Sequence, residues 1–162
     1  MPEIFARAES LLLAMFFAAA WGAHLLWASV FFPPVAAEPP KSLFDWLATP
    51  YAMRLFGFWR RLVPCLYLLA LIAVVEAAIM GLRTRPTLAV AGVCGLLHAA
   101  MVFGIFLPIN LKLGLDPGGP GPSSLAPQMV ETLLRRWGRW NFVRIGVETT
   151  GLIAALFAFR AS

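Results

Sequence analysis

The chain has 162 residues, of which 60% are hydrophobic and only 13% charged, with a net charge of +5 and a mean hydropathy of +0.80. This composition excludes an ordinary water-soluble domain, because so small a chain cannot hide that much apolar surface from water. Nucleic-acid binding is also excluded, since the basic residues flank apolar segments and form no soluble basic face. The expected partners of these residues are anionic lipid headgroups, and we expect an integral protein of the plasma (inner) membrane.

Four apolar segments are each long enough to cross a bilayer. They lie at about residues 11–32, 62–82, 87–109 and 141–159. About 20 apolar residues in a helix cross the roughly 30 Å of hydrocarbon in a bilayer. Little chain remains for a soluble domain. The sequence therefore predicts an all-α fold, with residues 1–162 forming a single four-helix transmembrane bundle.

The segments between these spans carry two further patterns. Residues 51–61 interleave aromatic side chains with arginines, and residues 128–140 place apolar side chains opposite basic ones. Both patterns are typical of helices at the level of the lipid headgroups, so we expect interfacial loop helices. Residues 114–127 are rich in glycine and proline and predict a loop. The two long loops are expected on one side of the membrane and both termini on the other, which we assign to the cytoplasm.

Every predicted span contains an ionisable residue. These residues are His24, Glu76, His98, and Arg144 with Glu148. Charged groups inside a bilayer cost roughly 2.5–3.5 kcal/mol each on insertion scales and usually face a bundle interior or a wet cavity. Counted from the long-loop end at about 1.5 Å per residue, the histidines and Glu148 lie at similar depths, with Glu76 about a turn deeper. The sequence predicts that they meet at one central site.

The residue types of this site are compatible with several cofactors. Two histidines with carboxylates suit non-haem iron or copper, and two histidines alone suit a haem. The candidate metal ligands are His24, Glu76, His98 and Glu148. The Glu-x-x-His pair expected of a di-iron carboxylate site does not occur in the sequence. A site without any cofactor also stays open.

A purely structural role is the competing interpretation. Arg144 and Glu148 lie four residues apart on one helix and can pair with each other. Glu76 and His98 can form a buried hydrogen-bonded couple that joins the second and third spans. In that case the polar groups only hold the helices together.

The polar residues of the last span share one helical face. Asn141, Arg144 and Glu148 fall on the same stripe as Gly151 and Ala155 at helical spacing. An amide, a guanidinium and a carboxylate therefore face the same way. We expect them to face the interior of the bundle.

Two motifs give the chain a resemblance to a known family. The third span ends in Leu-Pro-Ile-Asn-Leu-Lys-Leu at residues 107–113, and the fourth begins Arg-Trp-Gly-Arg-Trp-Asn-Phe-Val-Arg at residues 136–144. These motifs resemble the anthrone-oxygenase-like family of small four-span membrane proteins. The family pattern is Pro-x-Asn followed by Leu, then Arg-Trp-x-x-x-(His or Asn)-x-x-Arg. The matching residues are Pro108, Asn110, Leu111 or Leu113, Arg136, Trp137, Asn141 and Arg144.

The resemblance implies oxidation of a flat phenolic substrate. Characterised members of that family insert oxygen into anthrones and give anthraquinones. The fungal-type enzymes have histidine at the position of Asn141. If that histidine acts as a base or a ligand, the asparagine of this chain retains only its hydrogen-bonding ability.

Together these features predict a membrane oxidoreductase of the oxygenase type. Its small hydrophobic substrate, aromatic or quinone-like, is expected to enter from the bilayer into a pocket walled by Trp21, Trp27 and Met101. Arg144 stabilises an oxyanion in this interpretation, and His24 or His98 removes a proton or holds a cofactor. The candidate catalytic residues are His24, His98, Asn110, Asn141, Arg144 and Glu148.

Two alternatives from other functional classes remain. One is a non-catalytic protein that binds lipid or quinone, or that serves as a scaffold for a partner membrane protein. The other is a haem-binding electron-transfer protein that uses His24 and His98. A homo-oligomer is compatible with every one of these interpretations.

Overall fold

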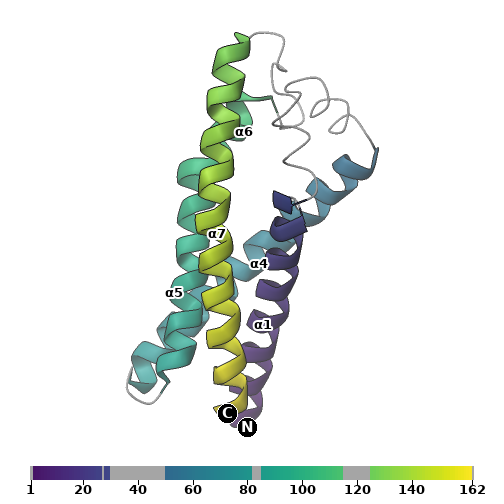
Figure 1. The fold of residues 1–162 in the computed structure, drawn as a ribbon. Helices are drawn as coiled ribbons and strands as arrows, with labels where there is room; N and C mark the ends of the chain where they lie inside the picture. Colours follow the sequence, from purple (N-terminus) through teal and green to yellow (C-terminus); the bar gives the residue numbers. More distant parts are fainter. Residues whose placement is uncertain (1, 27, 30–49, 82–84, 115–124, 162) are drawn as a thin grey trace.

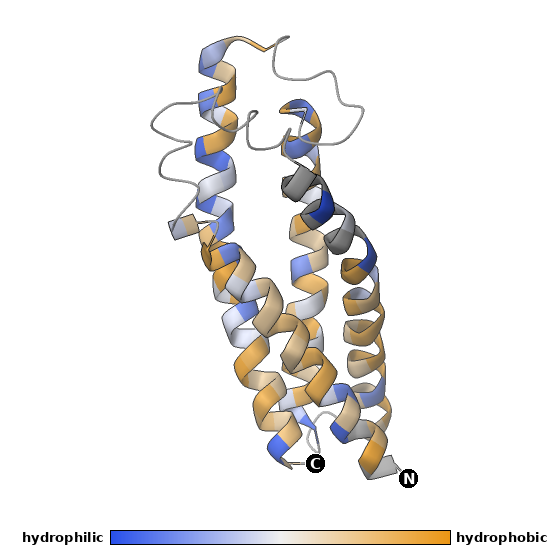
Figure 2. Cartoon of the chain, turned by 90° about the vertical axis from the view of Figure 1, so that its right-hand side faces the viewer, coloured by the Kyte–Doolittle hydropathy of each residue, from blue (hydrophilic) through white to orange (hydrophobic). Residues whose placement is uncertain are grey.

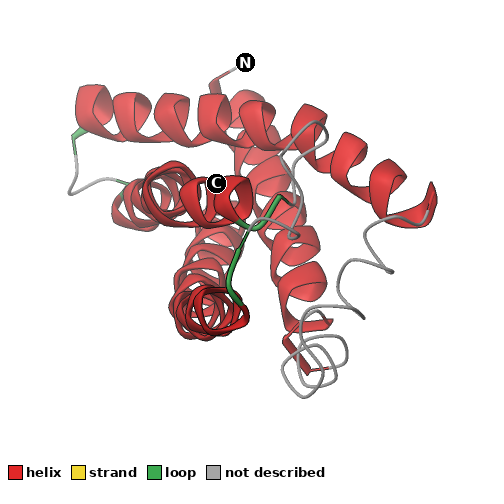
Figure 3. Ribbon diagram, turned by 90° about the horizontal axis from the view of Figure 1, so that it is seen from above, coloured by secondary structure: helices red, strands yellow, loops and turns green. Residues whose placement is uncertain are grey.

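The computed structural model describes residues 2–26, 28–29, 50–81, 85–114 and 125–161. All regular structure in these residues is helical, with no strand among them (Figures 1 and 3). The elements are α1 (Pro2–Leu26), α4 (Pro50–Met80), α5 (Pro86–Met101), the π-helix η2 (Val102–Phe106), α6 (Leu107–Lys112) and α7 (Pro127–Ala161).

Proline and glycine mark the ends of the helices. Each of the four long helices begins at a proline, namely Pro2, Pro50, Pro86 and Pro127. Proline suits the first turn of a helix because the missing N–H would have no helical partner there. The helices α4 and α6 are followed by Gly81, with φ 90°, and by Gly114, with φ 65°. Glycine adopts this left-handed conformation without a steric penalty, and it ends a helix for that reason.

Four helical segments are long and apolar enough to span a membrane. They are Arg7–Leu26, Arg61–Met80, Pro86–Lys112 and Pro127–Ala161. The predictions of an all-α fold and of four apolar helices of membrane-spanning length are confirmed. The third segment runs through α5, η2 and α6 to Lys112, beyond the predicted end at residue 109.

The two segments predicted as interfacial helices belong to longer helices. Residues 51–61 form the first turns of α4, which has 31 residues, and residues 128–140 form the first turns of the 35-residue helix α7. The predicted amphipathic segment at residues 128–140 and the apolar span predicted from residue 141 form one continuous helix, because basic side chains interrupt hydropathy without interrupting a helix. Residues 30–49 and 115–124, which include most of the predicted loops, lie outside the described residues.

The bundle is organised around α7 and α5. The helix α7 packs along both α1 and α5, α4 packs on α5, and α1 has a smaller contact with α4. Figures 1 and 3 show α4 crossing the other helices obliquely. Both termini lie at the end where α4 stops and α5 starts, as the predicted topology requires (Figure 1).

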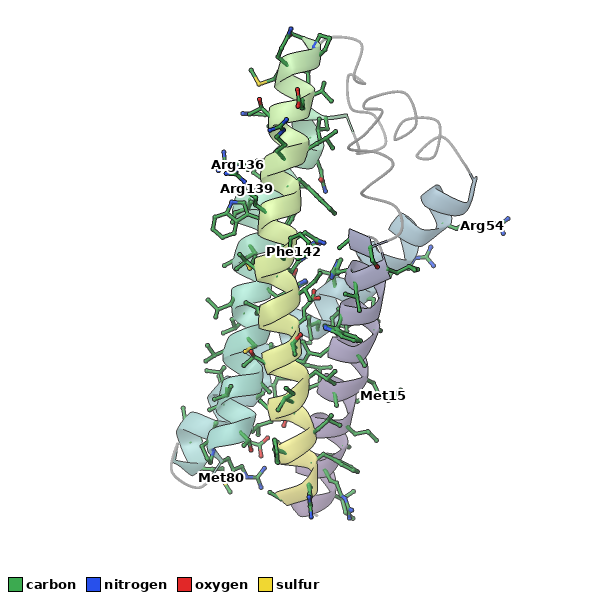
Figure 4. All side chains as sticks on the ribbon, in the orientation of Figure 1. Met15, Arg54, Met80, Arg136, Arg139 and Phe142 are labelled. Carbon is green, nitrogen blue, oxygen red and sulfur yellow. The ribbon has the colours of Figure 1, made fainter. Side chains whose placement is uncertain are left out.

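The outer surface of the helices is largely apolar. Figure 2 shows mostly apolar residues along the middle of the long helices, with polar ones toward both ends. Exposed side chains include Met15, Leu68, Ile79, Phe142 and Phe157. Figure 4 shows Met15 and Phe142 on the outside of the bundle, a pattern that suits a lipid environment.

The buried residues form two apolar clusters. The lower cluster joins α1, α4, α5 and α7 through residues such as Leu13, Phe17, Leu66, Leu88 and Ala155. The upper cluster joins α6 and α7 through Ile109, Leu113, Val130, Leu133 and Leu134. On α7, the buried residues Asn141, Arg144 and Glu148 lie between the two clusters. The polar groups therefore form a layer with apolar packing on either side.

Glycines permit close helix contacts at the lower cluster. A Cβ atom on Gly92 would lie 2.8 Å from the carbonyl oxygen of Ala70 in α4, and one on Gly151 would lie 2.5 Å from the ring of Phe17 in α1. Small residues allow close helix approach at Gly92 and Gly95, whereas Gly104 has no neighbouring atom within 4 Å of the place of a Cβ.

Candidate functional site: a buried histidine–glutamate cluster beside an arginine

Three ligand-type side chains from three helices meet at one carboxylate oxygen. Oε1 of Glu148 in α7 lies 2.6 Å from Nδ1 of His24 in α1 and 3.1 Å from Nε2 of His98 in α5. The side chain of Glu148 is fully buried, that of His98 is 3% exposed and that of His24 is 17% exposed. We call these three residues the central cluster. Its members are among the residues that the sequence predicts to converge.

Packing next to the cluster fixes the helices that carry it. Phe17 lies two turns before His24 on α1, and its ring contacts the glycine surface of α7 at Gly151, three residues after Glu148. A larger residue than glycine there would push α1 and α7 apart. The short distance between His24 and Glu148 therefore depends on Gly151.

A second group, the arginine arm, lies one helical turn from Glu148. The guanidinium of Arg144 donates a hydrogen bond from one terminal nitrogen to Oδ1 of Asn141. Its Cζ lies 4.0 Å from the centroid of the Phe106 ring and 5.7 Å from that of Trp137. A cation over an aromatic face is attracted by the quadrupole of the ring. Arg144 is only 6% exposed, so this charge is held inside the bundle.

The π-helix brings Phe106 to Arg144. Pro108 has no N–H to donate to the carbonyl of Gly104, so a regular α-helix cannot continue through this point. The chain widens at Val102–Phe106 instead, and the Leu107 N–H bonds to the carbonyl of Val102. The proline is thus accommodated by a π-helix, a feature that often occurs at functional sites.

Among the described residues, several buried polar atoms around these two groups have no hydrogen-bond partner. In the central cluster they are Oε2 of Glu148 and Nδ1 of His98; in the arginine arm they are Nε of Arg144 and Nδ2 of Asn141. Nε2 of His98 has its 3.1 Å contact with Oε1 of Glu148. Leaving a buried polar group unpaired costs about 1–3 kcal/mol, so such a gathering indicates a bound species.

Glu76 does not belong to the central cluster. Its Oε1 lies 2.7 Å from Nη1 of Arg85, and the side chains of this pair are 31% and 22% exposed. Of the four predicted metal ligands, the structure brings together His24, His98 and Glu148, whose ligand atoms all lie within 4.8 Å of one another. The predicted couple of Glu76 with His98 is replaced by the Glu76–Arg85 pair.

The predicted pairing within α7 is also replaced. Among the described residues, Arg144 makes its side-chain hydrogen bond to Asn141, and the contacts of Glu148 are to the two histidines. The α-helical spacing would permit an Arg144–Glu148 pair, but it does not decide the pairing. The carboxylate of Glu148 instead contacts the histidines of α1 and α5.

The remaining predicted residues are Asn110 and the expected pocket residues Trp21, Trp27 and Met101. Asn110 follows Phe106 by four residues, about one turn nearer the loop end, and its Oδ1 is buried without a partner. Met101 is buried and Trp21 is half-buried, whereas Trp27 lies outside the described residues. A pocket formed by these side chains stays a prediction.

Three residues next to the site were not singled out from the sequence as parts of it. The ring of Tyr67 in α4 lies 6.0 Å from that of His98, and its hydroxyl is buried without a partner. Phe106 and Trp137 flank Arg144. Trp137 precedes Arg144 by two helical turns, and this spacing could have predicted that both lie on one face of the helix. Nothing in the sequence places Tyr67 or Phe106 beside the site.

The arrangement does not suit a haem held by His24 and His98. The two ring centroids are 6.0 Å apart, and Oε1 of Glu148 lies close to both imidazoles. The iron of a bis-histidine haem would need that position, and the macrocycle would need a slot around it. A single ion or a small molecule fits the site better than a macrocycle.

Comparison with known proteins finds no matching family model, no characterised protein and no solved structure with significant similarity to this chain.

Proposed function

We propose that this protein is an integral inner-membrane oxidoreductase of the oxygenase type. Its substrate is a hydrophobic aromatic molecule with an acidic phenol or enol, of which an anthrone is the model. The observation that carries this proposal is the buried Arg144, stacked against Phe106 and adjacent in the helix to Glu148. A buried cation with an unpartnered donor, next to a buried carboxylate, is suited to forming and holding an oxyanion.

The flat aromatic surroundings of Arg144 favour a flat anion. Nε of Arg144 and Nδ2 of Asn141 are donors without a partner, and both side chains are buried. A phenolate or enolate oxygen accepts from these donors, and the substrate ring adds apolar contact with Phe106 and Trp137. Asn110, one turn farther along, is positioned to contact the far end of such a molecule.

The central cluster supplies the proton acceptor. Oε1 of Glu148 contacts the imidazoles of His24 and His98, while Oε2 has no hydrogen-bond partner among the described residues. Glu148 Oε2 takes a proton from the activated CH₂ group of the substrate, and His24 and His98 hold the carboxylate in position. The resulting enolate is stabilised by Arg144.

Molecular oxygen completes the reaction. The CH₂ carbon loses two hydrogens and gains one oxygen atom as a carbonyl, and the second oxygen atom leaves with the two hydrogens as water. The enolate supplies the electrons that reduce O₂. The net change is CH₂ plus O₂ to C=O plus H₂O, which is the conversion of an anthrone to an anthraquinone.

An oxygen-uptake assay with a matched pair of arginine variants tests this proposal. The probe is 1,8-dihydroxyanthrone, added to the purified protein in detergent micelles, with protein-free micelles correcting for autoxidation. Arg144→Met should lower kcat/KM by about 100-fold or more, the usual loss when one oxyanion donor is removed. Arg139→Met changes an exposed arginine on the outside of α7 (Figure 4) and should leave it unchanged.

Two outcomes would contradict the proposal. One is wild-type protein that does not accelerate oxygen uptake, and the other is a folded Arg144→Met variant as active as the wild type. Anthrone binding without oxygen uptake would support a non-catalytic binding protein instead.

A further inference from the structure

The ligand atoms of the central cluster have the composition of a metal site. They are two imidazole nitrogens and one carboxylate oxygen, contributed by α1, α5 and α7. Two histidines and one carboxylate form the ligand set of many non-haem iron centres, which leave further coordination positions open. Three helices far apart in sequence supply these atoms, so the fold builds the set on rigid elements.

The spacing of the atoms is close to what an ion requires. With bonds of about 2.0–2.2 Å, ligand atoms at neighbouring positions around one ion lie roughly 3 Å apart. The distance from Oε1 of Glu148 to Nε2 of His98 is 3.1 Å. The distance to Nδ1 of His24 is 2.6 Å, which is that of a hydrogen bond. Since metal ligands must be deprotonated, an ion would replace the proton of this hydrogen bond.

Buried polar atoms without a hydrogen-bond partner distinguish a metal site from a simple contact between helices. If the cluster only joined helices, burial would favour pairing every polar atom. Here His98 is 3% exposed, yet among the described residues neither its Nδ1 nor Oε2 of the fully buried Glu148 has a hydrogen-bond partner. A ligand is needed to satisfy these atoms.

We propose that His24, His98 and Glu148 bind one divalent transition-metal ion through Nδ1, Nε2 and Oε1. The choice of iron(II) among such ions rests on the proposed function, because reaction with O₂ calls for a redox-active metal. The site itself does not depend on that function. Glu148 Oε2 stays outside the ligand set and keeps its role as proton acceptor.

Metal binding is measured directly on the full chain, without any substrate. Protein purified in detergent without a polyhistidine tag is loaded anaerobically with Fe²⁺ or Co²⁺, desalted and analysed for metal per chain. The expected result is about one ion per chain. His24→Gln, His98→Gln and Glu148→Gln should each weaken the affinity by about tenfold or more, as loss of a ligand or its support typically does. Glu76→Gln is the matched control and should bind as the wild type does.

A spectroscopic measurement on the wild type covers the case of a variant that does not fold. The electron paramagnetic resonance spectrum of the Cu²⁺-loaded protein should show superhyperfine coupling to two imidazole nitrogens. Absence of a stoichiometric ion in folded wild type, or full affinity in folded His98→Gln, would overturn the metal site. A chain that binds metal but leaves the anthrone untouched would overturn the proposed function alone. Folded wild type that oxidises the anthrone but retains no stoichiometric ion after loading would overturn the metal site alone.

Discussion

Two acidic groups on the membrane-spanning helices, Glu76 and Glu148, differ in what surrounds them. Glu76 lies near the end of α4 and pairs with Arg85, nine residues away across the turn into α5, with both side chains partly exposed. Glu148 lies in the middle of α7, fully buried, and faces two histidines from other helices. Glu76 has a full charge opposite it, whereas Glu148 retains an unpaired oxygen.

This difference separates a structural ion pair from a candidate site. A partly exposed pair formed between neighbouring helices needs little help from the rest of the fold and contributes little to stability. A buried carboxylate with unpaired atoms is costly unless something binds to it. Similar residue types in similar apolar helices therefore carry different functional meaning.

The largest expected effect comes from removing the two carboxylates in turn. Glu148→Ala leaves two buried imidazoles facing each other without an acceptor, and it should lower the free energy of unfolding by about 3–5 kcal/mol. Glu76→Ala should lower it by about 0–1 kcal/mol. Thermal unfolding in detergent, followed by circular dichroism, measures both. Equal losses would mean that the two carboxylates are equivalent.

A pair of glycine variants tests whether helix spacing controls the central cluster. Gly151→Ala places a Cβ against the Phe17 ring, and Gly92→Ala places one against the backbone of Ala70. Each should cost about 1–3 kcal/mol through overpacking. Only Gly151→Ala moves α1 relative to α7, so only this variant should also weaken Co²⁺ binding. If Gly92→Ala weakened binding as much, loss of general stability would be the cause.

Replacing Arg144 by lysine separates its charge from its shape. Arg144→Lys keeps the positive charge but loses the planar group that lies over Phe106 and bonds Asn141. We expect kcat/KM for the anthrone probe to fall about tenfold, because lysine does not replace a stacked, multidentate arginine. Steady-state oxygen uptake gives the value. Unchanged kinetics would show that charge alone suffices.

The smallest effect is expected at an exposed pair on α7. Oε1 of Glu131 lies 2.5 Å from Nη2 of Arg135, one turn away, and the two side chains are 50% and 73% exposed. Glu131→Gln should change the free energy of unfolding by less than about 0.5 kcal/mol and leave metal binding unchanged. The same unfolding and metal assays apply. A large effect would mean that the first turns of α7 contribute to stability or to metal binding.

Much of the fold was predictable from local pattern. Hydropathy located the four apolar helices, and the run from Asn141 to Glu148 correctly indicated a stripe that turns out to be buried. The apolar spans predicted from residues 62 and 141 are parts of the longer helices α4 and α7, because hydropathy reports only the apolar part of a helix. Proline at Pro50 and Pro127 was the better signal for where these helices begin.

The sequence by itself determined the class of fold and the residues available for chemistry, because helix formation and apolar length depend on neighbours along the chain. It did not determine the partners of those residues. Arg144 and Glu148 have the right spacing to pair, yet Glu148 faces His24 and His98 while Arg144 lies between Phe106 and Trp137. Those contacts join residues from different helices, and they depend on the side-by-side packing of α1, α5 and α7 and on the widened turn before Pro108. Only the tertiary structure decides such contacts, since helix packing and local geometry bring distant residues within bonding distance.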